Sequence, residues 1–174
     1  MLNTLLAYSP DGKLAARYDK IHLFGFTRGQ ESYDESRTIV AGQDVAVLET
    51  PQLRVGLSVC YDLRFPELFR AQAAAGATLL SVPAAFTAKT GAVHWHPLLL
   101  ARAVENQCLV LAPGQCGTHP GGRRTHGHSL ILGPWGETLA EVTHDEPGIA
   151  VAEIDLAQLD AVRQRFPALA HRRL

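Results

Sequence analysis

The chain has 174 residues, 47% hydrophobic and 19% charged, which is typical of one soluble domain with a sizeable core. Its formal net charge of -1 argues against a nucleic-acid partner, and no apolar run approaches the ~20 residues that a membrane span needs. Three cysteines without a CxxC spacing argue against a disulfide framework. The N-terminus lacks the pattern of a signal peptide, so we expect a cytoplasmic protein.

Strands and helices are predicted in alternation over the first two-thirds of the chain. In chain order, the predicted elements are strands over 2–8, 13–20, 45–49 and 53–59, a helix over 66–75, a strand over 78–82, a helix over 94–106 and a strand over 107–112. The polar segment 25–42 has no periodicity and predicts no element. Strand–helix–strand order favours parallel strands with helices packed on the sheet.

The pattern changes in the last third of the chain. A loop rich in Gly, Arg and His is predicted over 114–127, and strands are predicted over 128–132, 138–142 and 148–154. Asp155 is a plausible N-cap for a final helix that ends near Phe166.

Cys60 stands where an apolar strand runs directly into the beginning of a helix. Free N–H groups and the dipole at a helix start favour a thiolate, so Cys60 is a candidate nucleophile. A buried core cysteine is the other interpretation, and the turn alone leaves the two about even. Cys108 lies in an apolar run and is expected in the core, and Cys116 is expected to be a small, semi-buried residue.

Lys20 lies on the more apolar face of its predicted strand, together with Leu14, Ala16 and Tyr18. A desolvated ammonium can stabilise an oxyanion or a thiolate. The alternative is a lysine that extends to water at the end of a strand, and the residues alone favour that alternative.

Two histidine pairs, His94 with His96 and His126 with His128, have the i, i+2 spacing that places two imidazoles on one face of a strand. The first pair falls in a predicted helix, where residues two apart diverge. We therefore expect no metal site from these pairs; a zinc hydrolase would require bound metal.

Several segments carry a more specific signal when they are taken together and in order. They are residues 18–24, 56–68, 83–86, 90–95, 101–107 and 127–136, followed by Phe166-Pro167 and 171–173. Over essentially the whole chain they resemble the nitrilase, or carbon–nitrogen hydrolase, superfamily. The resemblance is closest to its Nit-type amidase branch, which includes omega-amidase and deaminated glutathione amidase.

The resemblance implies an α/β fold, an α-β-β-α sandwich of two facing sheets with helices outside, in a single domain over residues 1–174. It also implies a homodimer or higher homo-oligomer formed through the helix after Cys60 and the helix around 95–106. Chemistry in this family uses no metal or cofactor, and the expected partner is a small-molecule amide.

The resemblance also assigns catalytic roles. Cys60 would attack the amide carbonyl to form a thioester, while Lys20 and the backbone N–H of Tyr61 hold the oxyanion. A second glutamate, which positions the lysine, falls on Glu35, with Glu31 as the competing assignment.

Other site residues follow by the same analogy. Phe86 and Thr87 are expected to line the substrate pocket. Arg64 and Glu67 are expected to brace the elbow around the cysteine and not to reach the substrate.

The family's catalytic set includes another glutamate upstream of the lysine motif, the general base, but residues 1–19 contain no glutamate. We therefore expect the chain to represent the C-terminal two-thirds of the domain, without its N-terminal strands and helix. Loss of the base predicts an impaired amidase. The alternative is a non-catalytic remnant that associates with full-length homologues.

Overall fold

A computed structural model of the chain describes residues 1–28, 31–143 and 146–173. The strands are β1 (Thr4–Tyr8), β2 (Leu14–Asp19), β3 (Gly25–Arg28), β4 (Glu31–Asp34), β5 (Val47–Glu49), β6 (Arg54–Leu57), β7 (Leu79–Ser81), β8 (Leu109–Ala112), β9 (Cys116–Thr118), β10 (Arg124–His126), β11 (Leu130–Leu132) and β12 (Thr138–Glu141). The helices are α1 (Pro66–Ala74), α2 (Ala88–Asn106) and α3 (Leu156–Arg165), with short 3₁₀ helices η1 (Glu35–Arg37) and η2 (Cys60–Arg64).

One mixed sheet forms the centre of the fold, with the strand order β12-β11-β8-β7-β6-β5. The middle strands β6, β7 and β8 are parallel, and β5, β11 and β12 are added antiparallel at the edges. The crossovers from β6 to β7 and from β7 to β8 contain α1 and α2. The predicted parallel order is therefore confirmed.

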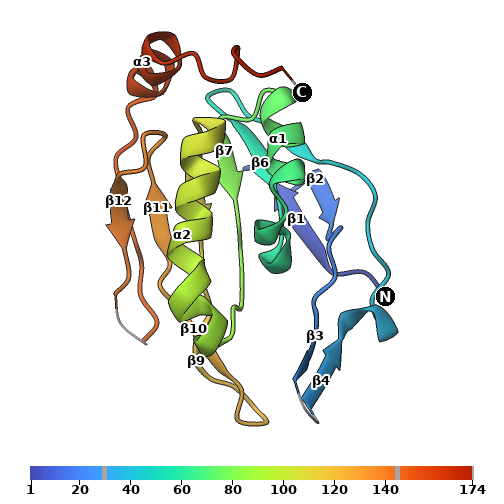
Figure 1. The fold of residues 1–174 in the computed structure, drawn as a ribbon. Helices are drawn as coiled ribbons and strands as arrows, with labels where there is room; N and C mark the ends of the chain where they lie inside the picture. The colour runs from blue at the N-terminus through green and yellow to red at the C-terminus, as the bar shows by residue number, and fades with distance from the viewer. Residues whose placement is uncertain (29–30, 144–145, 174) are drawn as a thin grey trace.

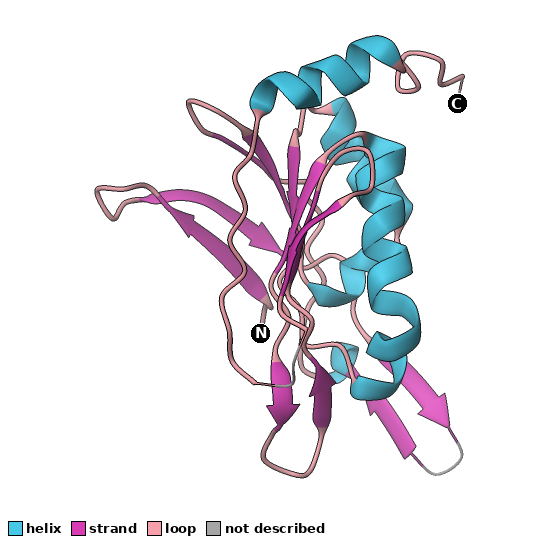
Figure 2. Cartoon of the chain, turned by 90° about the vertical axis from the view of Figure 1, so that its left-hand side faces the viewer, coloured by secondary structure: helices cyan, strands magenta, loops and turns pink. Residues whose placement is uncertain are grey.

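The elements lie in layers (Figures 1 and 2). Helices α1 and α2 cover one face of the central sheet, and the antiparallel β1–β2 hairpin projects on the other side. The core between the sheet and the helices includes Leu80, Val110, Phe69, Trp95 and Leu99, all 1% exposed or less. The fold is therefore of the α/β class, and the β1–β2 hairpin lies on the side of the central sheet where the expected sandwich would have its second sheet.

Local signals explain the helix boundaries. Pro66 occupies the first turn of α1, and Gly76 follows its end with a φ of 89°, a conformation that favours glycine. The side chain of Thr87 accepts a hydrogen bond from the N–H of Thr90 and caps α2, and that of Asp155 accepts one from Ala157 and caps α3. Helix α2 therefore begins at Ala88, six residues before its predicted start.

Two segments contain strands that the sequence does not predict. Residues 25–42 include the β3–β4 hairpin, and the predicted loop over 114–127 includes the β9–β10 hairpin. Both hairpins are short and have no apolar alternation to mark a buried face, so periodicity could not reveal them.

The predicted strand over 148–154 is wrong. This segment belongs to no strand, and Ile149 and Val151 are 89% and 79% exposed. Alternating apolar residues favour a strand only when a neighbouring strand supplies backbone partners. No other strand in the described part of the chain pairs with this segment.

A close backbone approach joins α2 to β10. A Cβ atom at Gly91 would lie 2.2 Å from the Cβ of His126, so only glycine allows the first turns of the helix to lie against this strand.

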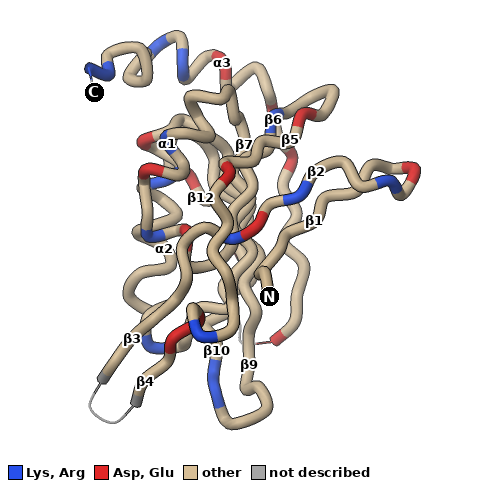
Figure 3. The backbone as a smooth tube through the Cα atoms, turned by 90° about the vertical axis from the view of Figure 1, so that its right-hand side faces the viewer, with Lys and Arg blue, Asp and Glu red and all other residues tan. Residues whose placement is uncertain are grey.

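The described chain has neither a large surface region of one charge nor a strongly apolar helix. Basic and acidic side chains alternate along the tube in Figure 3 without a large region of one sign. In the described ranges we find no helix with both the length and the apolar character to cross a membrane.

Candidate active site

Cys60 occupies a strained turn at the carboxyl end of β6. Its φ is 51°, in the left-handed region that residues other than glycine rarely adopt, and its N–H donates to the carbonyl of Pro83 at 2.9 Å. Strained backbone of this kind clusters at functional sites, where the surrounding structure holds it in place. The turn therefore presents the Cys60 side chain from a fixed position.

Burial raises the pKa of the Cys60 thiol, and the lowering effects of the Ala85 backbone hydrogen bond and of Lys20 do not compensate. This corrects the expectation that a helix start favours the thiolate here. Helix α1 begins only at Pro66, and Cys60 opens the single 3₁₀ turn η2 instead. A short 3₁₀ turn carries a much smaller dipole than an α-helix.

Lys20 and Glu35 form a buried ion pair. Lys20 is 3% exposed, so its side chain does not extend to water, and Glu35 is 8% exposed. Burial favours the protonated form of Glu35, but hydrogen bonds from Lys20, from the Phe24 N–H (2.7 Å) and from Asn3 (3.1 Å) outweigh it and lower the pKa of this carboxyl. Glu35 is thus an ionised acceptor that fixes the lysine ammonium.

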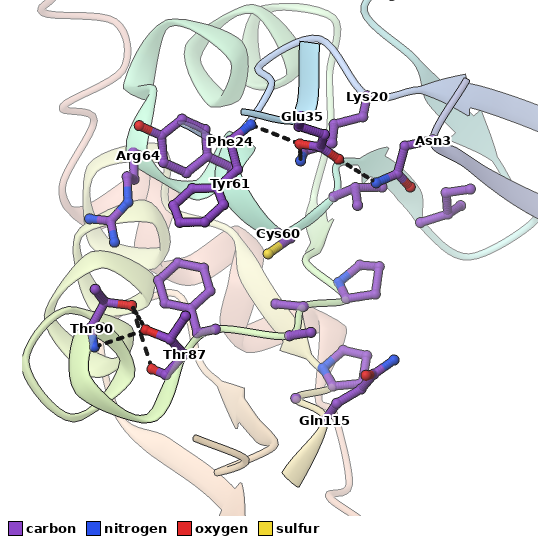
Figure 4. A pocket seen from close by; sticks show the side chains of 18 of the residues that line it. Asn3, Lys20, Phe24, Glu35, Cys60, Tyr61, Arg64, Thr87, Thr90 and Gln115 are labelled. Atoms are coloured by element: carbon purple, nitrogen blue, oxygen red, sulfur yellow. Dashed lines mark hydrogen bonds and ion pairs between the residues drawn. The ribbon is translucent and has the colours of Figure 1, made fainter. Parts of the chain in front are cut away.

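One cavity of about 670 Å³ contains the sulfur of Cys60 together with the Lys20–Glu35 pair (Figure 4). Much of its lining comes from the loops that follow β6, β7 and β8. Carboxyl ends of parallel strands meet at the same edge of a sheet, which is where open α/β folds bind ligands. The fold therefore brings the two predicted motifs, around residues 20 and 60, to a single site.

The remaining predicted residues also line this cavity. Tyr61, Phe86 and Thr87 are part of the lining, and the Thr87 side chain at the same time caps α2. Arg64 lies there too, with its guanidinium over the rings of Tyr61 and Phe86 at 5.7 and 5.2 Å. Arg64 therefore packs against two residues of the elbow and of the cavity wall, and it also lines the cavity.

Glu35 is a glutamate that the structure places beside Lys20. Glu35 opens η1 directly after the β3–β4 hairpin, and its carboxylate turns back toward the strand end that carries the lysine. Glu31 lies at the start of β4, and its side chain falls outside the described residues.

Asp62 connects the segment around Lys20 with the segment around Cys60, a role that sequence reasoning missed. Its fully buried carboxylate accepts hydrogen bonds from the Tyr18 hydroxyl (2.8 Å), the Val59 N–H (2.9 Å) and the His22 N–H (3.0 Å). Tyr18 and His22 flank Lys20, and Val59 precedes Cys60. Asp62 lies inside the cysteine motif and could have been noticed there. Its partners Tyr18 and His22, however, are distant in sequence, so the contact could not be predicted.

Two more cavity residues were not anticipated. Asn3 holds the second oxygen of Glu35, and Arg123 reaches the cavity from the loop between β9 and β10, donating to the Ala85 carbonyl at 3.2 Å. Neither lies in a segment with a distinctive local pattern, so no sequence signal could have identified them.

The histidine pairs do not act as pairs. His94 contacts Arg64, whereas His96 contacts Glu141, as expected for residues two apart on a helix. His126 and His128 lie with their rings stacked at 4.4 Å. None of these four residues lines the cavity that holds Cys60.

Comparison with known proteins agrees with this geometry. The carbon-nitrogen hydrolase family profile matches residues 1–164. A deaminated glutathione amidase from Synechocystis sp. is 49% identical over 98% of this chain and 63% of its own length. The chain thus spans under two-thirds of this curated relative.

Solved structures show the same fold. The Caenorhabditis elegans NitFhit protein superposes with a TM-score of 0.93 at 44% identity, over 99% of this chain and 42% of that one. A variant of an amidase from Nesterenkonia sp. AN1 (TM-score 0.78, 34% identity, 98% of this chain and 61% of that one) carries the acetamide moiety of fluoroacetamide on its active-site cysteine. This chain belongs to the carbon–nitrogen hydrolase family.

Proposed function

We propose that the chain supplies the nucleophile and the oxyanion site of an amidase that cleaves small linear amides of the omega-amide type. The observation that carries the proposal is that Cys60, on a strained turn, shares one cavity with the Lys20–Glu35 ion pair. A cysteine beside a fixed cation is the arrangement that acyl transfer through a thioester requires.

In the proposed reaction the Cys60 Sγ forms a bond to the amide carbon, and the C–N bond breaks. The nitrogen leaves as ammonia or an amine with the proton that the thiol releases. The Lys20 ammonium and the Tyr61 N–H stabilise the negative oxygen of the tetrahedral intermediate. Water then attacks the thioester, which releases the carboxylic acid and restores the thiol.

The substrate class is supported by the relatives and by the cavity. A relative with 49% identity is named deaminated glutathione amidase, a protein that acts on an amide of a small molecule. The cavity has room for a small linear molecule, and Phe86 and Thr87 form part of its wall. We propose these two residues as substrate contacts.

The chain by itself should be a weak amidase. General base assistance contributes about 10²–10⁴ in rate, and the raised pKa of Cys60 leaves the thiol protonated at neutral pH. Residues 1–19 contain no glutamate that could accept this proton.

The nucleophile is tested by treating the purified chain with fluoroacetamide and locating the adduct by peptide mass spectrometry. We expect slow modification of Cys60, none in Cys60→Ser, and a slower reaction in Lys20→Met. Preferential labelling of Cys116 would contradict the assignment.

The impairment is tested separately by ammonia release from simple omega-amides. Little or no release is expected from the 174-residue chain. Release at the rate of a family member that has the general-base glutamate, abolished by Cys60→Ala, would show that the chain is not impaired.

A second candidate function is a non-catalytic subunit that associates with full-length homologues. The observation in its favour is a stripe of exposed apolar residues on α2, formed by Val93, Pro97, Leu100 and Val104, which we call the α2 stripe. Co-purification with a full-length homologue, together with an unreactive Cys60, would favour this function over the first.

Assembly and location belong to the same proposal. We place the homodimer contact on the α2 stripe, because an apolar helix face of this length is stabilised by burial against another surface.

The proposed location is the cytoplasm. The described cysteines, Cys60, Cys108 and Cys116, are free, which suits a reducing compartment.

A further inference from the structure

Three side chains from three elements meet at a second place in the molecule, away from Cys60. His96 comes from the middle of α2, His128 precedes β11, and Glu141 ends β12. The Nε2 of His96 and the Nδ1 of His128 lie 2.8 and 2.9 Å from the same oxygen of Glu141. We propose that these residues form a binding site for one divalent transition-metal ion of the zinc type.

The donor set selects the ion. Two imidazole nitrogens and one carboxylate oxygen suit Zn²⁺ and its neighbours in the first transition row, whereas Mg²⁺ and Ca²⁺ prefer oxygen ligands alone. The three donor atoms lie within 4.8 Å of one another. Donors around a tetrahedral ion at about 2.1 Å are roughly 3.4 Å apart, so small side-chain rotations would admit the ion.

Ring orientation explains why the site draws one histidine from each HxH pair. Nitrogen lone pairs lie in the plane of the imidazole ring, so those of the stacked His126 and His128 rings lie in two nearly parallel planes (22° apart), an arrangement that disfavours a shared ion. The rings of His96 and His128 lie at 71° to each other, with centroids 5.6 Å apart, and their donor atoms converge on Glu141. The proposed site departs from our expectation that these histidines bind no metal, because it combines one histidine of each pair with Glu141.

The ligands are held by the surrounding structure. The register of β11 and β12 sets Glu141 opposite Leu130, two residues beyond His128. His128 has a φ of 54°, and its carbonyl accepts a hydrogen bond from the Trp95 indole at 2.7 Å. Trp95 is buried and adjacent to His96, so one contact positions both histidines.

The site is open to solvent. The side chains are 20–44% exposed, so an ion can reach them from solvent. A bound metal would tie α2 to the β11–β12 hairpin and would stabilise the folded chain.

The test uses Zn²⁺ alone, followed by calorimetry and thermal unfolding, and Co²⁺ as a spectroscopic probe. We expect one equivalent of Zn²⁺ to bind the purified chain. The Tm should rise by roughly 5–10 °C at about 100 times the Kd. Co²⁺ should give visible ligand-field bands without a thiolate charge-transfer band.

Variants locate the site. His96→Gln and Glu141→Gln should each weaken Zn²⁺ binding by about tenfold or more, because each removes one of three ligands. His94→Gln, on the same helix, is the matched control and should bind as the parent does, and Cys60→Ser excludes the catalytic thiol as the ligand. The metal-free Tm of each variant shows whether it folds.

Three results would overturn the proposal. They are the absence of saturable binding to the folded chain, unchanged affinity in folded His96→Gln and Glu141→Gln, and loss of binding in Cys60→Ser. None of these outcomes bears on the amidase proposal, which uses no metal.

Discussion

Opposing effects act on the thiol of Cys60: burial raises its pKa, whereas the Ala85 backbone hydrogen bond and Lys20 lower it, and burial is the largest of these effects. The motif around Cys60 is local, so this residue could be identified from the sequence as a candidate nucleophile. The effect of burial on the thiol is not local, because it depends on what covers the sulfur in the folded chain. The prediction of a stabilised thiolate failed for that reason.

The first prediction concerns the reactivity of Cys60 with pH. Because burial raises its pKa, the thiolate fraction should keep increasing through the neutral range and beyond. Iodoacetamide labelling, followed on the Cys60 peptide by mass spectrometry, should accelerate about tenfold per pH unit from pH ~6.5 to ~8.5.

A small thiol of ordinary pKa, measured in parallel, provides the reference for this rate profile. Cys60→Ser should lose the labelled peptide altogether. A labelling rate that reaches its plateau below pH ~8 would mean that the thiol is activated in the free chain.

At the scale of elements, hydrogen bonds between segments distant in sequence hold the residues of the candidate site together. Asp62 joins η2 to the end of β2, and no periodicity in the sequence announces that contact. Lys20 could be placed on an apolar face from alternation alone, and its burial confirms that step. Its partner Glu35 depended on the family resemblance, because the β3–β4 hairpin that positions it has no apolar pattern.

The second prediction is that Asp62→Ala destabilises the chain by about 2–4 kcal/mol, because it leaves the Tyr18 hydroxyl and two backbone N–H groups without an acceptor. Tyr18→Phe removes a single one of these bonds and should cost about 1 kcal/mol. Urea unfolding gives both values.

Asp160→Ala, an exposed aspartate on α3, is the matched control and should change stability by less than about 0.5 kcal/mol. Equal losses for Asp62→Ala and Asp160→Ala would show that Asp62 does not connect the two motifs.

For the molecule as a whole, the notable feature is apolar surface that the described chain leaves exposed to solvent. The α2 stripe faces outward, and near its C-terminal end lies the turn that contains Trp135, whose ring contacts Phe166. The misassigned strand over 148–154 adds Ile149 and Val151 to the exposed apolar residues. A single sequence cannot tell a strand that pairs within the chain from one whose partner lies elsewhere.

The third prediction follows from the proposed contact on the α2 stripe. Replacing Leu100 and Val104 together by lysine places two charges on the stripe and should weaken self-association by about tenfold or more. Sedimentation velocity measures the change. Val40→Lys alters an apolar residue that is 63% exposed and far from α2 in sequence, and it should leave the assembly as it is.

If the double variant assembles as the parent does, the interface lies on another face. The β1–β2 hairpin and the 148–154 segment would then be the next candidates, because both carry exposed apolar side chains.

The glycine at position 91 has an effect beyond its own contact. The spacing between α2 and β10 leaves room only for the hydrogen atom that glycine has in place of a side chain. The first turn of α2 also carries Thr90 and follows Thr87, and both threonines line the cavity. Any larger side chain at position 91 would push the wall and the strand apart and so reshape the cavity from outside it. Variation at this position among relatives would therefore alter substrate selection without touching the substrate.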